Sequence, residues 1–155
     1  MIEHRAKFIS FDAAQTLIRV DWDPRRVALQ AVAMSNLECD EQVAAEIYMR
    51  LLQTRWADYK LRNRSRDYAQ VEAWWWELVS DWSRQMGWPE ASSETLFAAA
   101  EQLLHGEGNT SFVLFDDTLP CLRALTAAGT QCGVVSNWDM SLHRYCKDLG
   151  IAPYV

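Results

Sequence analysis

Long apolar runs, paired cysteines and an excess of basic residues are all missing from this sequence of 155 residues. No stretch approaches the roughly 20 apolar residues that a membrane-spanning helix needs, because even the segment 96–104 is interrupted by Glu101 and Gln102. The formal net charge is −6, the opposite of the basic surface that binds a phosphate backbone. We therefore expect neither a membrane nor a nucleic-acid partner.

The cysteines and histidines show no metal-binding or redox spacing. Four cysteines are scattered without a Cys-x-x-Cys pair, and no basic and then apolar leader precedes Lys7, so we expect a reduced, cytoplasmic protein. A histidine metal site would need three distant segments to converge, and we interpret the histidines as surface or capping residues. They are His4, His105 and His143.

Apolar and aromatic residues, by contrast, are plentiful. Half of the sequence is hydrophobic, which is enough for a globular core. Five of the eight tryptophans fall between residues 50 and 85. This concentration is typical of a helical core built on large aromatic side chains, and the alternative is a wall on which a ligand stacks.

Apolar periodicity predicts an α/β protein interrupted by a block of helices. Residues 7–12 and 131–136 are short and rich in β-branched or aromatic side chains, as in buried strands, and 151–155 look like the start of a third strand. Helices are predicted after each of the N-cap candidates, and further helices near 119–128 and 139–149 flank the second strand. The N-cap candidates are Asp23, Asp40 and Ser92 or Ser93, and a Trp-rich helix is expected over about 69–86.

This order predicts a parallel sheet covered by helices, with an inserted helical domain. Residues 1–19 and 109–155 are assigned to the α/β core, and residues 20–108 to the helical insertion.

Polar residues follow both predicted strands, at the end of a parallel sheet where such folds bind ligands. Asp12 ends the first strand, and Thr16 adds a hydroxyl after a segment short enough to turn its backbone N–H groups toward an anion. Ser136 and Asn137 follow the second strand, where a hydroxyl can bind an oxyanion. Taken singly, each of these residues fits an ordinary turn or helix cap equally well.

Together, the segments FISFDAAQTL and GVVSNWD resemble the first two motifs of the haloacid dehalogenase superfamily, and DDTLPCLRALTAAG resembles the helix before the second motif. The resemblance implies a partial Rossmann-like core with an all-helical cap, and a hydrolase of small phosphorylated or halogenated metabolites. It makes Asp12 the nucleophile that forms a covalent aspartyl intermediate. It also implies that Thr16, Ser136 and Asn137 bind the substrate, and that Asp12 and the carbonyl of Ala14 bind Mg²⁺.

The sequence departs from the family pattern in three places. Ala14 stands where the phosphatases have a second aspartate that acts as general acid and base, and family members that act on carbon–halogen bonds also lack it. Gln15 replaces a common glycine. The lysine of the third motif and the acidic pair of the fourth would follow Val155, since Lys147 lies too early. We therefore expect an inactive fragment of a hydrolase, and the alternative is a non-catalytic interaction protein with this fold.

Two charged clusters allow both a structural and a functional interpretation. The segment 60–67, with Arg62 and Arg64, is either a solvated loop between helices or a cap loop that meets an anionic substrate. Asp116 and Asp117 could bind a metal, but their place directly before a helix, where they oppose its N-terminal dipole, favours a capping role.

Overall fold

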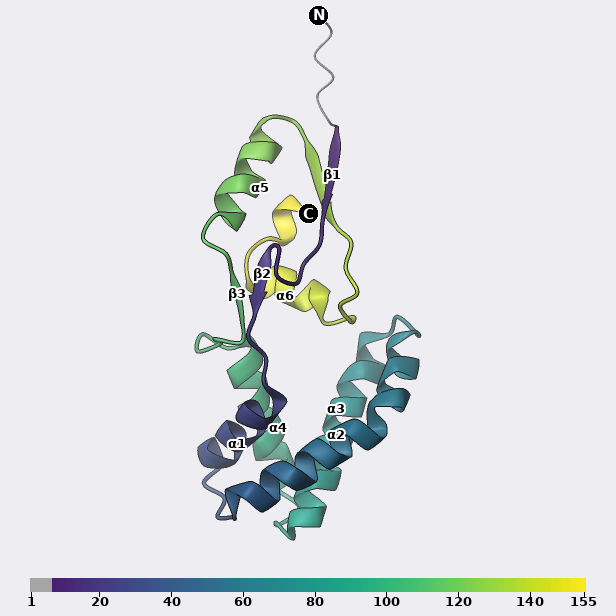
Figure 1. The fold of residues 1–155 in the computed structure, drawn as a ribbon, viewed down its shortest axis with the longest axis vertical. Coiled ribbons are helices and arrows are strands. Elements are labelled where there is room, and N and C mark those ends of the chain that lie inside the picture. The colour runs from purple at the N-terminus through teal and green to yellow at the C-terminus, as the bar shows by residue number, and fades with distance from the viewer. Residues whose placement is uncertain (1–6) are drawn as a thin grey trace, which may run out of the picture. The chain divides into compact units, whose positions relative to one another are not determined.

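The computed structural model describes residues 7–155, and His4 therefore lies outside the described residues. The chain forms two compact units: the first contains residues up to Asp21 together with Ser111–Val155, and the second is Trp22–Thr110. Figure 1 shows β1 to β4 with α5 and α6 in the first unit, and α1 to α4 in the second. The strands are β1 (Phe8–Phe11), β2 (Ile18–Val20), β3 (Phe112–Leu114) and β4 (Gln131–Val134). The helices are α1 (Pro24–Met34), α2 (Glu41–Asn63), α3 (Tyr68–Met86), α4 (Ser92–His105), α5 (Thr118–Ala127), α6 (Leu142–Asp148) and the 3₁₀ helix η1 (Ala152–Tyr154).

The helical unit begins where the aspartate caps predict. The carboxylate of Asp23 accepts bonds from the N–H groups of Arg25 and Arg26, and Asp40 caps α2 in the same way. These bonds satisfy donors that the first turn of a helix leaves without partners. The C-terminal end of α3 is followed by Gly87, whose φ of 72° is a left-handed conformation that a residue without a Cβ adopts without strain.

Tryptophans form much of the core of the helical unit. Trp74 and Trp82 on α3 are fully buried, and the indole N–H of Trp82 donates to the carbonyl of Ala44 on α2 at 2.9 Å. Trp56 and Tyr59 stack with a centroid distance of 4.6 Å, and Tyr59 also contacts Trp74. The core interpretation of the tryptophan cluster is therefore confirmed for its two buried members.

The α/β unit contains two small sheets. β1 and β4 pair in parallel, with Phe8 opposite Gln131 and Phe11 opposite Val134. β2 and β3 pair antiparallel, a sheet that the sequence analysis did not predict. The mixed α/β class, with a partial parallel sheet and an inserted helical unit, is confirmed, while the expectation of an entirely parallel arrangement is wrong.

Two local predictions are also wrong. Residues 152–154 form a 3₁₀ helix and not a strand, because the N–H of Tyr154 turns back to the carbonyl of Ile151. Neither Ser92 nor Ser93 caps α4: the N-cap position is Ala91, and both serines are buried within the first turn. These short segments contain residues compatible with several backbone conformations, and packing selects among them.

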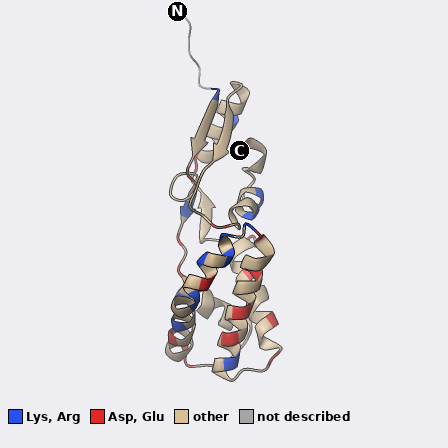
Figure 2. Cartoon of the chain, turned by 90° about the vertical axis from the view of Figure 1, so that its right-hand side faces the viewer, with Lys and Arg blue, Asp and Glu red and all other residues tan. Residues whose placement is uncertain are grey.

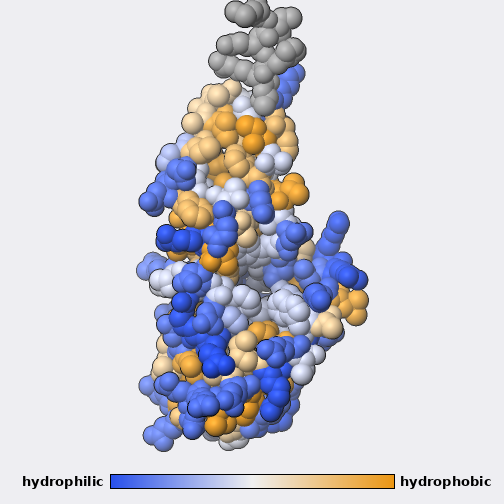
Figure 3. Space-filling view, viewed as in Figure 1, coloured by the Kyte–Doolittle hydropathy of each residue, from blue (hydrophilic) through white to orange (hydrophobic). Residues whose placement is uncertain are grey.

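Charged and apolar residues are distributed differently over the surface. Figure 2 shows charges of both signs on the helices of the helical unit. Figure 3 shows hydrophobic residues gathered over the upper part of the α/β unit. Two large hydrophobic side chains of this unit are exposed, Phe8 at 58% and Val135 at 71%. Among residues 7–155, no helix is both long enough and apolar enough to cross a membrane.

Candidate functional site at the ends of β1 and β4

Asp12 follows directly after β1, in the position that its sequence predicts. Its side chain is exposed, and its Oδ1 accepts a hydrogen bond of 2.7 Å from the N–H of Ala13. This bond orients the carboxylate and leaves the second oxygen at the surface. An oriented, solvent-accessible carboxylate can act as a nucleophile or as an anionic ligand.

The parallel pairing brings the second predicted segment to the same edge. The N–H of Val135 donates to the carbonyl of Phe11 at 2.9 Å, which extends the β1–β4 ladder by one residue. Phe11 is opposite Val134, so Asp12 is one residue and Ser136 two residues beyond this paired position. The chain therefore leaves β1 at Asp12 and β4 near Ser136, and these two points lie at the same carboxyl end of the parallel sheet.

Ser136 is half-buried and held by the residues that follow it. Its Oγ accepts the N–H of Trp138 at 3.4 Å, so the hydroxyl hydrogen remains available to donate to an anion. The ring of Trp138 contacts Phe112 and Tyr145, with centroid distances of 5.3 and 5.4 Å. Trp138 therefore holds the segment after β4 in place, a contact that the sequence pattern did not reveal. Asn137, between the two, is exposed.

The turn after Asp12 closes on itself and does not present its N–H groups to an anion. The carbonyl of Ala13 accepts from the N–H groups of Thr16, Leu17 and Ile18 at 3.3, 3.0 and 2.9 Å. The N–H of Gln15 donates to the carbonyl of Ile18 at 2.8 Å. The expectation that the N–H groups between Asp12 and Thr16 face an anion is therefore wrong for Gln15 and Thr16, because the turn satisfies these two donors internally. Thr16 keeps an exposed side chain.

Gln15 occupies the conformation for which a glycine is common. Its φ is 56°, in the left-handed region that side chains with a Cβ disfavour. A hydrogen bond of 2.9 Å from its Nε2 to the carbonyl of Val20 accompanies this conformation. The substitution noted in the sequence is therefore compatible with the turn, at the cost of local strain.

A buried hydroxyl outside the motifs ties this turn to α5. Thr118 is 2% exposed, and its Oγ1 donates to the carbonyl of Leu17 at 2.9 Å. Asp117 is the N-cap residue of α5 by position, but its side chain makes no capping hydrogen bond. The expected capping by Asp116 and Asp117 is therefore not made through a side-chain hydrogen bond of Asp117, although both residues precede α5, where a carboxylate opposes the helix dipole.

The arginines proposed as substrate contacts belong to the helical unit. Arg62 lies in the last turn of α2 and not in a loop, and its guanidinium donates twice to Glu77, both at 2.9 Å, and pairs with Asp58 at 3.1 Å. These bonds raise the pKa of Arg62 and hold the pKa of Glu77 below its usual value. Arg62 is therefore a structural bridge between α2 and α3. Arg64 is the exposed C-cap residue of α2.

The described residues do not fit a complete magnesium site. Residues 7–155 contain no cluster of three acidic, histidine or cysteine side chains that could hold a metal. Asp12 is the one carboxylate in the motif, and one of its oxygens already accepts the N–H of Ala13. Mg²⁺ prefers octahedral oxygen ligands, of which Asp12 and the carbonyl of Ala14 would supply two. The described residues therefore supply only part of a magnesium coordination shell.

Comparison with known proteins finds matches among solved structures but none among family models or curated sequences. Among solved structures, the chain is similar to a 2-haloacid dehalogenase from Pseudomonas syringae pv. Tomato DC3000, with 21% identity and a TM-score of 0.49. The match covers 97% of this chain, which spans 61% of the length of that protein.

Proposed function

We propose that Asp12 is the nucleophile of a haloacid dehalogenase-like hydrolase that acts on a small phosphorylated or halogenated metabolite. The observation that carries this proposal is the β1–β4 pairing, which brings the segments of Asp12 and Ser136 to one edge of a parallel sheet. The oriented carboxylate of Asp12 and the available hydroxyl hydrogen of Ser136 suit the two ends of one small anionic substrate.

Ala14 and the closed turn favour the halogenated class of substrate. A phosphate ester needs a proton on its leaving oxygen, and Ala14 has no group to give one. A halide leaves without protonation. The N–H groups of Thr16, Leu17 and Ile18, which could otherwise cradle a phosphate, are bonded to Ala13.

In the proposed reaction, a carboxylate oxygen of Asp12 attacks the carbon that bears the halogen. The new C–O bond forms as the C–halogen bond breaks, and the halide departs with the bonding electron pair. Water then cleaves the ester at the Asp12 carbonyl, which yields the hydroxy acid, restores the carboxylate and releases one proton to solvent. Ser136 donates a hydrogen bond to the substrate carboxylate.

Trapping the intermediate tests this proposal directly. The 155-residue chain is incubated with α-chloropropionate, and the intact protein and its peptides are then weighed by mass spectrometry. We expect a slow mass gain on the peptide that contains Asp12, absent in Asp12→Asn and present in Asp116→Asn, a control on an exposed carboxylate of the same unit. Absence of the adduct, or an adduct that persists in Asp12→Asn, would contradict the proposal.

Turnover is expected to be low even if the adduct forms. Residues 1–155 do not include the lysine and acidic pair that the family resemblance requires. Magnesium-dependent cleavage of an aryl phosphate should therefore be near the uncatalysed rate, because loss of a single electrostatic donor costs about 10²- to 10³-fold. Substantial phosphatase activity that disappears in Asp12→Asn would show that other residues of this chain replace the missing groups.

The alternative is a non-catalytic interaction protein with the same fold. The specific observation in its favour is the internal closure of the turn around Ala13, which removes backbone donors from a substrate. Under either function, we propose that the helical unit Trp22–Thr110 corresponds to the helical cap implied by the resemblance.

A further inference from the structure

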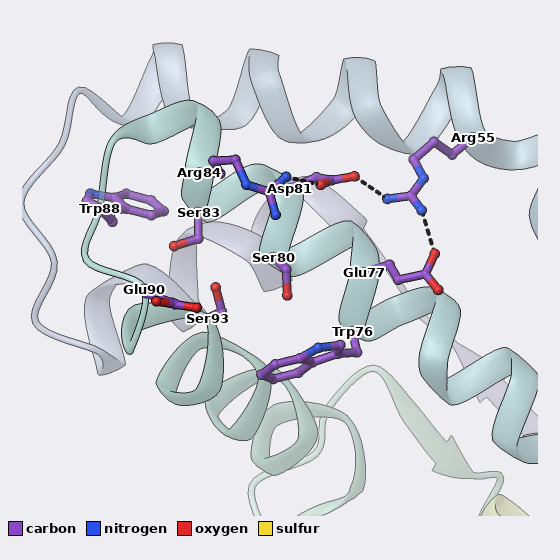
Figure 4. Close-up of a pocket in the computed structure, with 10 residues that line it drawn as sticks. All are labelled: Arg55, Trp76, Glu77, Ser80, Asp81, Ser83, Arg84, Trp88, Glu90 and Ser93. Carbon is purple, nitrogen blue, oxygen red and sulfur yellow. Dashed lines mark hydrogen bonds and ion pairs between the residues drawn. The ribbon is translucent and has the colours of Figure 1, made fainter.

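The helical unit contains a cavity that the strand-end site does not use. Its volume is about 730 Å³, within the range of small-molecule sites. Residues of α2, α3, α4 and the segment between α3 and α4 line it, and all of them belong to Trp22–Thr110. Figure 4 shows two indoles, Trp76 and Trp88, flanking a group of serine side chains.

One polar group in this cavity is buried without a partner. Ser83 is 1% exposed, and its Oγ has no hydrogen-bond partner among the described residues. A hydroxyl buried in this way is costly, and native structures normally pair it with a protein group, a water or a ligand. Ser93, also buried, lies on the same cavity wall.

The charges around the cavity leave one carboxylate unpaired. Arg55 bridges Glu77 and Asp81 at 2.9 and 2.7 Å, and Arg84 pairs with Asp81, as the dashed lines in Figure 4 show. Within residues 7–155, the carboxylate of Glu90 has no ion pair or side-chain hydrogen bond. Arg62, outside the lining, also pairs with Glu77, so among the described residues the exposed Glu90 is the one lining carboxylate without an ion pair.

We infer that this cavity binds a small organic ammonium ion that carries an apolar or aromatic body. The ammonium hydrogens would donate to the Glu90 carboxylate and the Ser83 hydroxyl, which supply acceptors and no competing positive charge. Indole faces attract cations and also pack against an apolar body. Trp76, which is 40% exposed, offers such a surface at the cavity. An anionic ligand would instead be repelled by the carboxylate of Glu90.

Calorimetry with three probes of matched size tests the charge preference in the full 155-residue chain. We expect phenethylamine to bind with a Kd on the order of 1 mM or tighter, and phenethyl alcohol and phenylpropionate to bind at least about tenfold more weakly. Equal binding of the alcohol would overturn the cation assignment, and so would preferred binding of phenylpropionate. Absence of phenethylamine binding would overturn the site itself.

Two variants locate the binding. Glu90→Gln should weaken phenethylamine binding by about tenfold, and Ser83→Ala should weaken it by a smaller factor, while Glu94→Gln on the same helical unit should leave it unchanged. Circular dichroism confirms that each variant is folded. Unchanged binding in Glu90→Gln would overturn the proposal. The site is independent of Asp12, so Asp12→Asn should bind phenethylamine as the unmodified chain does.

Discussion

The hydroxyl of Thr118 donates a hydrogen bond of 2.9 Å to the main-chain carbonyl of Leu17, which lies 101 residues earlier in the chain. The same carbonyl accepts the N–H of Phe115 at 3.3 Å. The two bonds attach the turn after Asp12 to the start of α5. They also hold the two sequence-distant parts of the α/β unit together.

Thr118→Val should lower the free energy of unfolding by about 1–2 kcal/mol, because it removes a buried donor while keeping the shape of the side chain. Denaturant unfolding measures this difference. Thr126→Val is the matched control on the same helix, where the hydroxyl bonds only to the carbonyl of Leu122 within the helix. Equal destabilisation in both variants would show that the bond to Leu17 carries no special weight.

Gln15 offers a test of backbone strain next to the candidate nucleophile. Gln15→Val should destabilise the chain by about 1–2 kcal/mol, because a β-branched residue is disfavoured at φ 56° and cannot donate to Val20. Gln15→Gly should cost less, since relief of the strain offsets the lost bond. Thermal unfolding ranks the three proteins. A valine variant more stable than the glycine variant would contradict the left-handed turn.

The bridge between Arg62 and Glu77 predicts a dependence of stability on pH. The hydrogen bond that Arg62 donates to Glu77 holds the pKa of Glu77 below its ordinary value, although burial of Glu77 opposes this shift. A carboxyl group with a lowered pKa in the folded state stabilises the protein above its unfolded-state pKa, and this contribution is lost as the pH falls through the folded-state pKa. Both side chains are partly exposed, so the contribution should be at most about 1 kcal/mol.

Glu77→Gln should therefore be less stable than the unmodified chain at pH 7, and the difference should shrink as the pH falls below about 4, in the range of carboxyl titration. Thermal unfolding across this range measures the difference. Glu72→Gln, on an exposed position of the same helix, should show little effect at either end. A difference that grows toward acid would have the wrong sign for this ion pair.

Trp74 and Trp82 are equally buried but differ in hydrogen bonding. The indole N–H of Trp82 bonds to Ala44, whereas that of Trp74 has no hydrogen-bond partner among the described residues. Trp82→Phe should therefore destabilise the chain by about 1 kcal/mol more than Trp74→Phe, since packing losses are similar at two fully buried sites. Denaturant unfolding of the two variants supplies the comparison. The opposite order would indicate that packing outweighs the hydrogen bond.

The sequence by itself determined the features that depend on neighbours a few residues apart. Asp23 and Asp40 cap helices because their carboxylates reach N–H groups two and three residues ahead. The strand at Phe8–Phe11 and the buried Trp74 follow from apolar patterning, which is equally local. The position of Asp12 at the end of a strand was predictable for the same reason.

The tertiary structure alone decided the contacts between distant residues. The bond of Thr118 to Leu17, the bridge of Arg62 to Glu77 and the antiparallel pairing of β2 with β3 join segments whose spacing in the sequence carries no periodic signal. The tertiary structure also decides, in part, that the turn around Ala13 is closed, because a short polar segment can direct its N–H groups either outward or inward. Only the packing of the completed fold selects between these arrangements, because every buried N–H group needs a hydrogen-bond acceptor in the same folded structure.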